Sequence, residues 1–228
     1  MKATKKATKK ATKKATKKGP GIELSDAAIC TAALALIDED GLDAFSTRML
    51  GRVLGCEAMA IYWYYPSKEA LLDAVVDQLM TGVAHAVTPR TDWLAVLRQV
   101  AHAYRDLAHA HPRAFPLLAT RRFASEGTYA FLEKLFALAR SQDIDDRVTA
   151  RFYRVVSSYC SGFALNELAA PPRDTATLRT RFARVASVST WLAPEHLDEI
   201  FHFGLELQLA ALAKEQAPSH RAAARSTR

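Results

Sequence analysis

Residues 46–73 read STRMLGRVLGCEAMAIYWYYPSKEALLD and contain the clearest structural pattern in this chain of 228 residues. Ser46 and Ser67 each stand directly before a run of helically spaced apolar residues, where a serine hydroxyl accepts hydrogen bonds from free backbone N–H groups of a first turn. Gly55 lies between two short helical segments and suits a tight turn. A long helix followed by two short ones around such a turn is typical of a helix-turn-helix motif. The same spacing also fits three small helices that close one end of a bundle.

The helix before these segments, expected near residues 25–39, has an apolar face that can cover both short helices. Ser25 and Gly41 mark its start and its stop. The side chains expected in this small core are Ile29, Ala33, Leu36 and Ile37 from the long helix and Leu50, Val53 and Ile61 from the short ones.

Four consecutive aromatic residues, Tyr62 to Tyr65, end the second short segment. In a helix Ile61 and Tyr65 share one face, so Met59, Tyr62 and Trp63 must point largely elsewhere. An exposed aromatic row on so short a helix indicates a binding partner.

A lysine at position 68 begins the next helix, where a cation opposes the helix dipole at a cost of about 0.3–1 kcal/mol. A phosphate bound at this helix start would reverse that sign, because it would accept from both the lysine and the free backbone N–H groups. The alternative is an exposed lysine beside Glu69 that binds nothing.

From residue 24 to residue 216, apolar residues recur at intervals of three and four with almost no alternating β-branched stretches, which predicts an all-α fold. Helices are expected at residues 25–39, 46–54, 57–64, 67–82, 92–110, 113–122, 126–141, 144–169, 175–191 and 195–215.

The stretches 46–55 and 60–73 closely resemble the DNA-binding domain of the tetracycline-repressor (TetR) family of transcriptional regulators. A weaker resemblance continues through residues 93–105, 162–167 and 203–207. It implies an Ω-shaped homodimer in which an N-terminal three-helix helix-turn-helix DNA-binding domain is joined to a C-terminal helical ligand-binding and dimerisation domain. A small-molecule effector would release such a repressor from a palindromic double-stranded DNA operator.

On this basis we divide the chain into four parts. They are a disordered lysine-rich arm (1–21), the helix-turn-helix DNA-binding domain (22–68), the ligand-binding and dimerisation domain (69–216) and a disordered basic tail (217–228).

The resemblance also implies which side chains contact DNA: Thr47, Arg48, Ala58, Met59, Ala60, Tyr62, Trp63, Tyr64 and Lys68. Arg48 would reach guanine O6 and N7 bidentately. Residues 58–60 would lie along base edges, and Tyr62, Tyr64 and Lys68 would hold phosphates. Because alanines at 58 and 60 replace polar residues of the tetracycline repressor, its operator sequence is not carried over.

The positions that the resemblance assigns to the effector are Val100, Tyr104, Leu118, Arg121, Leu135 and Asn166. Magnesium needs oxygen ligands that valine and leucine lack, so we expect no metal and no other cofactor. The expected effector is largely apolar, with an anionic or carbonyl group near Arg121, in a cavity between the helices at 92–110, 113–122, 126–141 and 144–169. The alternative is that Val100, Leu118 and Leu135 are ordinary core residues.

Two apolar stripes are candidates for a four-helix dimer interface, which the resemblance implies, or for internal core packing. They are Phe152, Val155, Val156, Tyr159 and Phe163 in one helix and Leu197, Phe201, Leu205, Leu209 and Leu212 in the other.

The net charge of +7 belongs to the ends of the chain and not to its body. Residues 1–18 contain nine lysines and no acid in a Lys-Ala-Thr-Lys repeat, whereas the other 210 residues carry 22 Lys and Arg against 24 Asp and Glu. The arm is either a tether to DNA or a solubilising tail. With the arm as the main DNA contact, the alternative function is a non-specific DNA-coating protein of the nucleoid type.

Other classes of protein are disfavoured. Three distant cysteines, Cys30, Cys56 and Cys160, form neither a disulfide framework nor a zinc motif and favour a reducing, cytoplasmic location. No apolar run reaches the roughly 18 residues of a membrane span. The motifs HExxH, GxSxG and GxGxxG are missing, so we expect no enzyme.

Overall fold

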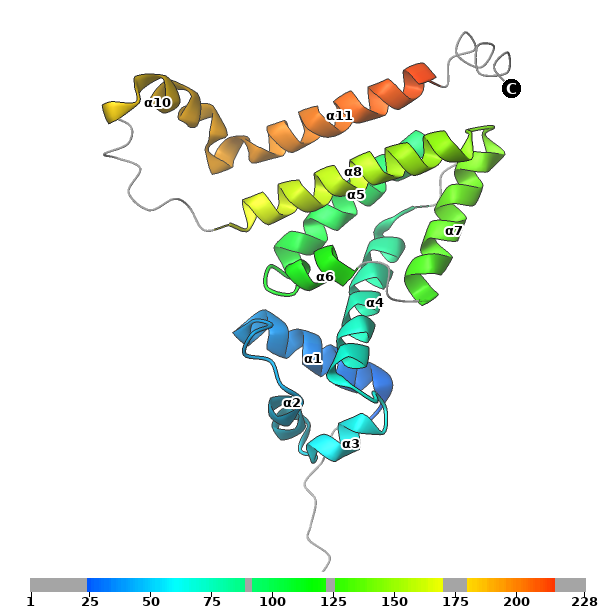
Figure 1. The fold of residues 1–228 in the computed structure, drawn as a ribbon, viewed down its shortest axis with the longest axis vertical. Helices are drawn as coiled ribbons and strands as arrows, with labels where there is room; N and C mark the ends of the chain where they lie inside the picture. The colour runs from blue at the N-terminus through cyan, green and yellow to red at the C-terminus, as the bar shows by residue number, and fades with distance from the viewer. Residues whose placement is uncertain (1–23, 89–91, 122–125, 170–179, 216–228) are drawn as a thin grey trace, which may run out of the picture.

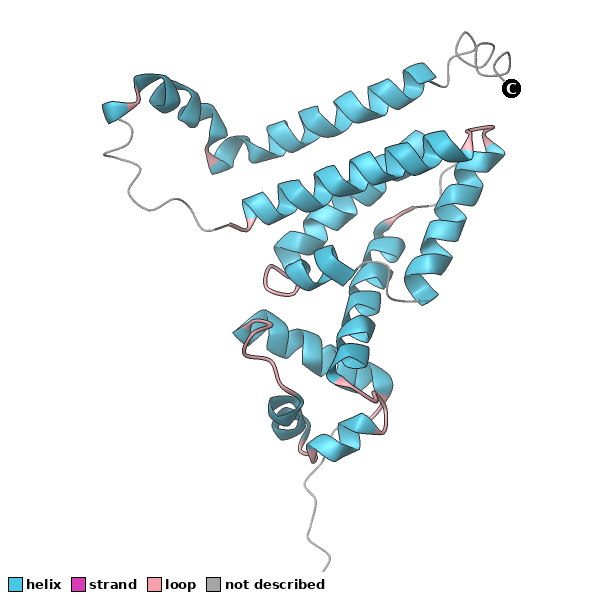
Figure 2. Ribbon diagram, in the orientation of Figure 1, coloured by secondary structure: helices cyan, strands magenta, loops and turns pink. Residues whose placement is uncertain are grey.

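The computed structural model describes residues 24–88, 92–121, 126–169 and 180–215, and every regular element in these ranges is helical (Figure 2). The expected all-α fold is confirmed. The helices are α1 (Asp26–Asp40), α2 (Thr47–Leu54), α3 (Ala58–Tyr62), α4 (Lys68–Ala86), α5 (Trp93–Ala110), α6 (Phe115–Arg121), α7 (Glu126–Ser141), α8 (Asp146–Glu167), α10 (Ala183–Ser189) and α11 (Leu197–Glu215), with 3-10 turns η1 (Thr190–Leu192) and η2 (Pro194–His196).

Most helices lie where the sequence predicts them, and the differences are at their ends. The α-helix expected at 57–64 ends at Tyr62, and the N–H groups of Tyr64 and Tyr65 both donate to the carbonyl of Ile61 in a closing turn before Pro66. The helix expected at 67–82 runs four residues further, to Ala86. Part of the helix expected at 175–191, together with the arm 1–21 and the tail 217–228, lies outside the described residues. In its described part the prediction of one continuous helix was wrong, because Phe182 is not helical and α10 gives way to the 3-10 turn η1 after Ser189.

Three serines begin the helices of the N-terminal domain, as the sequence predicts. The hydroxyl of Ser25 accepts from the backbone N–H of Ala28, and Ser46 accepts from that of Met49. Ser67 starts α4 in the same way, at 3.0 Å from the N–H of Ala70. Each cap satisfies a donor that the first helical turn leaves free, which contributes about 1 kcal/mol.

The helices α1, α2 and α3 form a small unit, which we call the head, around an apolar centre (Figure 1). Gly55 ends α2 in the left-handed region at φ 67°, and a Cβ on Gly51 would lie 2.8 Å from the carbonyl oxygen of Cys56. Glycines at these two positions therefore permit the tight turn between α2 and α3. Ile29, Ala33, Ile37, Leu50 and Ile61 are fully buried as expected, and Leu36 is also buried.

One residue expected in this core lies outside it. The side chain of Val53 is 54% exposed, because it lies beyond the edge of the buried face of α2, which Leu50, Gly51 and Leu54 form. The expectation for Val53 was wrong.

The remaining helices form the body, and α4 connects the head to it (Figure 1). The beginning of α4 lies beside the head, and its later turns pack against α5 and α7. α8 and α11 run side by side on the face of the body away from the head. Trp93, Phe115 and Phe201 are the largest fully buried side chains of this core.

Polar contacts on the two sides of α6 reach the head and the helix that connects to it. His111, just before α6, lies 2.6 Å from the carboxylate of Asp38 on α1. Arg121, at the end of α6, donates to Asp73 at 3.0 Å and also to Glu69, both on the first turns of α4. α6 is thus held to both helices that orient the head.

A row of polar pairs joins α5 to α11, which run antiparallel. Arg98 binds Glu206 through both oxygens, at 2.5 and 2.9 Å. Arg105 donates to Asp198 at 2.6 Å, and between these pairs the ring centroids of His102 and His202 are 6.1 Å apart. This register turns the apolar face of α11 toward the body.

The two apolar stripes proposed for a dimer interface belong largely to the core of a single chain. Phe152, Val156, Phe201, Leu205, Leu209 and Leu212 are buried in the described chain. Internal packing, the alternative to an interface, therefore explains most of both stripes. Val155 differs, with 45% of its side chain exposed.

The described part of the chain contains no helix that is both long and apolar enough to cross a membrane.

Candidate functional site

The outer face of α2 and α3 presents exposed aromatic, apolar and cationic side chains. Trp63 is 86% exposed and Met59 66% exposed, and Tyr62, Tyr64 and Arg48 are also at the surface. The prediction that Met59, Tyr62 and Trp63 point away from the core is confirmed, and Tyr65, on the face of Ile61, packs against the core. The other predicted DNA contacts are partly buried, Thr47, Ala58 and Ala60 in the head and Lys68 at the start of α4.

Two tyrosines of this face also brace the head. The hydroxyl of Tyr62 lies 3.2 Å from that of Thr47, which joins the end of α3 to the start of α2. Tyr64 donates to the backbone carbonyl of Leu24 at 2.9 Å and so holds the chain just before α1. Their hydroxyls are positioned before any ligand arrives.

Lys68 has a structural role that sequence reasoning missed. Its ammonium group donates to the carbonyl of Phe45 at 2.9 Å and lies 5.4 Å from the centroid of the Phe45 ring. It therefore attaches the first turn of α4 to the segment that enters α2. A lysine has two further N–H donors, so a phosphate contact stays a prediction.

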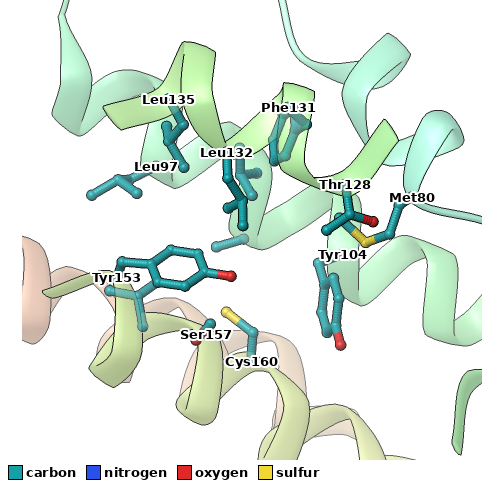
Figure 3. A pocket seen from close by; sticks show the side chains of 13 residues that line it. Met80, Leu97, Tyr104, Thr128, Phe131, Leu132, Leu135, Tyr153, Ser157 and Cys160 are labelled. Atoms are coloured by element: carbon teal, nitrogen blue, oxygen red, sulfur yellow. The ribbon is translucent and has the colours of Figure 1, made fainter. Parts of the chain in front are cut away.

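The body contains a cavity between four helices (Figure 3), which we call the body cavity. Its lining residues are Leu97, Val100, Ala101 and Tyr104 of α5, Thr128, Phe131, Leu132 and Leu135 of α7, Tyr153, Val156, Ser157 and Cys160 of α8, and Met80 of α4. Each of the three long walls is one helical face with the spacing i, i+3, i+4, i+7.

The chemistry of this lining is apolar with a few neutral polar groups. None of its described residues is acidic, basic or histidine. Burial raises the pKa of the Cys160 thiol to about 12, so the sulfur carries no charge at neutral pH. The hydroxyl of Tyr104 already lies 3.2 Å from that of Ser161.

Three of the six residues predicted for the effector line the body cavity, and three do not. Val100, Tyr104 and Leu135 line it. Leu118 is fully buried elsewhere, and the exposed Asn166 donates to the carbonyl of Gly162 in its own helix. The wall expected from α6 is supplied by α4 instead.

Arg121 does not lie at the cavity either, because it binds two carboxylates of α4. Hydrogen bonding to Glu69 first, and to Asp73 next, raises the pKa of its guanidinium above the ordinary value. The expected pairing of Arg121 with an anionic group of the effector was therefore not supported.

The cavity residues that were missed share a signal that was available in the sequence. On α7 and α8 they repeat the interval pattern of the predicted positions on α5, so extending one helical face from Leu135 identifies Thr128, Phe131 and Leu132. Met80 could not be identified in this way, because different turns of α4 pack against the head, α5 and α7.

Comparison with known proteins finds matches for both parts of the chain. Residues 29–75 match the family described as bacterial regulatory proteins, tetR family, and residues 87–215 match the tetracyclin repressor-like C-terminal domain.

Among curated proteins, the class A tetracycline repressor of Escherichia coli transposon 1721 is 35% identical over 103 residues, which are 41% of this chain and 48% of that protein. The matched stretch thus spans about half of that relative. The class G tetracycline repressor of Vibrio anguillarum is 24% identical over 86% of this chain and 96% of its own length. A solved structure from Streptomyces coelicolor, a possible TetR family transcriptional regulator, superposes with TM-score 0.71 at 27% identity over 83% of this chain and 99% of that one.

Proposed function

Because the chain belongs to the tetR family of bacterial regulatory proteins, whose members are transcriptional regulators and not enzymes, we propose that it is a repressor released from DNA by a small molecule. The observation that carries this proposal is that one helix, α4, contacts both the head and the body cavity. α4 holds the head through Lys68 at one end and contributes Met80 to the wall of the body cavity at the other.

The head supplies the DNA contacts. Residues Ala58 to Ala60 at the start of α3 enter a major groove, where Met59 meets base edges and thymine methyl groups. Arg48 donates to a guanine. Tyr62, Tyr64 and Lys68 bind phosphates, and Trp63 covers the adjoining sugar-phosphate backbone.

A second copy of the chain completes the repressor as a homodimer. The outward face of α11 carries Phe203 at 64% and Leu207 at 56% exposure, and that of α8 carries Val155 and Leu165 at 45% and 39%. These faces lie on neighbouring helices that point away from the head. A two-fold axis there would bury them against the same faces of the partner and direct both heads to one side of the dimer.

Ligand binding reaches the head through α4. Met80 and Lys68 are 12 residues apart, about 18 Å along the helix. A ligand that displaces Met80 shifts α4, while His111 holds α1 of the head and Arg121 holds the first turns of α4. Because the head follows Lys68, the spacing of the two heads changes, and they no longer fit successive major grooves.

This mechanism requires only modest energies. A tenfold loss of operator affinity corresponds to about 1.4 kcal/mol of preference of the ligand for the released state. Displacement of one packed side chain supplies an effect of that size.

Selection from a pool of random-sequence duplexes tests this function. The protein should enrich a two-fold symmetric sequence, and Arg48→Ala should lose the preference at one base of each half-site. Retention of all duplexes alike, with no enriched sequence, would overturn the proposal and favour non-specific coating by the lysine-rich arm.

A further inference from the structure

We propose that the body cavity selects an uncharged ring compound and rejects anions, cations and metal chelates. This inference rests on the proposed function only for the consequence of binding, because the selectivity follows from the lining itself. It also replaces the expectation of an anionic group in the effector.

The first observation is the absence of a compensating charge. The described lining carries no ionised side chain, and the Cys160 thiol is neutral. A charged ligand group would therefore lose its hydration without gaining a counter-ion, which is the costly case for any buried charge.

The second observation is that two arginines close to the predicted effector positions, Arg105 and Arg121, are already paired with carboxylates. Arg105 follows the lining residue Tyr104 in the chain, but it donates to both oxygens of Glu167, at 2.7 and 2.9 Å, and to Asp198. Arg121 is bound by Glu69 and Asp73. An anionic ligand would have to break one of these carboxylate pairs to reach a guanidinium.

The third observation concerns metals. Tetracycline-type recognition through a chelated magnesium ion needs oxygen or imidazole ligands from the protein. Among the described lining residues, the only oxygens are neutral hydroxyls and backbone carbonyls of helices. A chelated cation would thus find no carboxylate or imidazole.

The fourth observation is what the lining does offer. Tyr104, Phe131 and Tyr153 present aromatic rings from three different helices, and Met80 and Cys160 add polarisable sulfur (Figure 3). Rings stack or meet edge to face on such walls, and sulfur contacts add about 0.3–1.5 kcal/mol each. Figure 3 shows Tyr153 and Cys160 of α8 facing Phe131 and Leu132 of α7 across the space.

The size of the cavity favours a compact ligand. The empty space between the lining residues, including the open mouth, is about 580 Å³. A compact ring compound fits this space, and a larger group extends into the mouth or moves Met80.

Calorimetric titration of the full chain without DNA, using three matched compounds at pH 7, tests this selectivity. They are 2-naphthol, which is neutral, 2-naphthoate, an anion, and 2-naphthylmethylammonium, a cation. We expect 2-naphthol to bind and each ion to bind at least tenfold more weakly. Equal or tighter binding of either ion, or no binding of any of the three, would overturn the proposal.

Variants locate the binding. Leu132→Trp fills the cavity and should abolish 2-naphthol binding, and Val100→Phe, which adds less volume, should weaken it if the first variant folds poorly. Asn166→Ala, an exposed change outside the lining, is the matched control and should bind like the parent. Unchanged binding by both cavity variants would refute the assignment of this site.

Ser157→Lys tests the role of charge directly, because it adds an ammonium group to the lining. Ser157 is only partly buried, so the aliphatic part of the lysine side chain can pack against the cavity wall. The variant should bind 2-naphthoate at least tenfold more tightly than the parent does. If the parent fails these tests but still enriches a symmetric operator, the selectivity is wrong and the repressor function stands. If the parent passes these tests but enriches no symmetric operator, the selectivity stands and the repressor function is wrong.

Discussion

Replacing Arg105 by methionine should destabilise the protein far more than the same change at Arg98, although both arginines join α5 to α11. The side chain of Arg105 is 11% exposed, and that of its partner Glu167 is 4% exposed. The Arg98 and Glu206 side chains are 39% and 36% exposed. Hydrogen bonding to Glu167 raises the pKa of Arg105 above its ordinary value, so the guanidinium stays charged at any working pH.

The magnitude follows from the carboxylate that the change leaves behind. Methionine in place of Arg105 leaves Glu167 buried, with only the His109 imidazole 3.4 Å away. Removing one partner of a buried pair costs about 3–5 kcal/mol, whereas an exposed pair contributes about 0.2–1 kcal/mol. For a chain of this length the buried change should lower Tm by roughly 6–20 °C and the exposed one by at most about 4 °C.

Thermal unfolding followed by circular dichroism at pH 7 measures both variants. The loss in Tm should be several times larger for Arg105→Met than for Arg98→Met, because only the first change leaves a buried carboxylate without its guanidinium partner. Equal losses for the two variants would refute the idea that Arg105 neutralises a buried carboxylate.

Three further outcomes concern DNA and assembly. Arg48→Ala should cost about 1–3 kcal/mol of operator binding and relax one base preference, whereas Lys68→Ala should weaken binding to all sequences alike and also loosen the head. Competition with base-substituted duplexes distinguishes the two effects, and a change of base preference in Lys68→Ala alone would show that the roles are reversed. Deleting residues 2–18 should lower affinity for specific and random DNA by similar factors, and should reduce the slope of log binding constant against log salt concentration by up to about 8, the value for all nine lysines. An unchanged slope would show that the arm does not contact DNA. Phe203→Glu should convert the dimer to a monomer in light scattering, whereas Arg140→Glu, a change at another exposed position, should stay dimeric as the control. If both variants remain dimeric, α11 is not the interface.

Local features of this chain were predictable because their causes lie within a few residues. Ser25, Ser46 and Ser67 cap their helices by bonds to an N–H three residues on. The exposed aromatic row was predictable too, since Ile61 fixes which face of α3 is buried.

Features that depend on long-range contacts were not predictable in this way. The sequence suggested that Lys68 binds a phosphate, but in the structure its ammonium group donates to the carbonyl of Phe45, 23 residues earlier. Arg121 finds its carboxylates about 50 residues away, on a helix that only the tertiary fold places beside α6. The apolar stripes of α8 and α11 fitted an interface and a core equally, and the antiparallel pairing of α5 with α11 decides for the core.

A hydroxyl-radical footprint on an enriched duplex tests most directly whether two heads read one operator and a ligand releases them together. We predict two protected blocks related by two-fold symmetry, with centres one helical turn or about 34–36 Å apart, and simultaneous loss of both blocks when a cavity ligand saturates the body. A single block, or protection that spreads along the duplex with protein concentration and ignores the ligand, would contradict a ligand-responsive dimeric repressor.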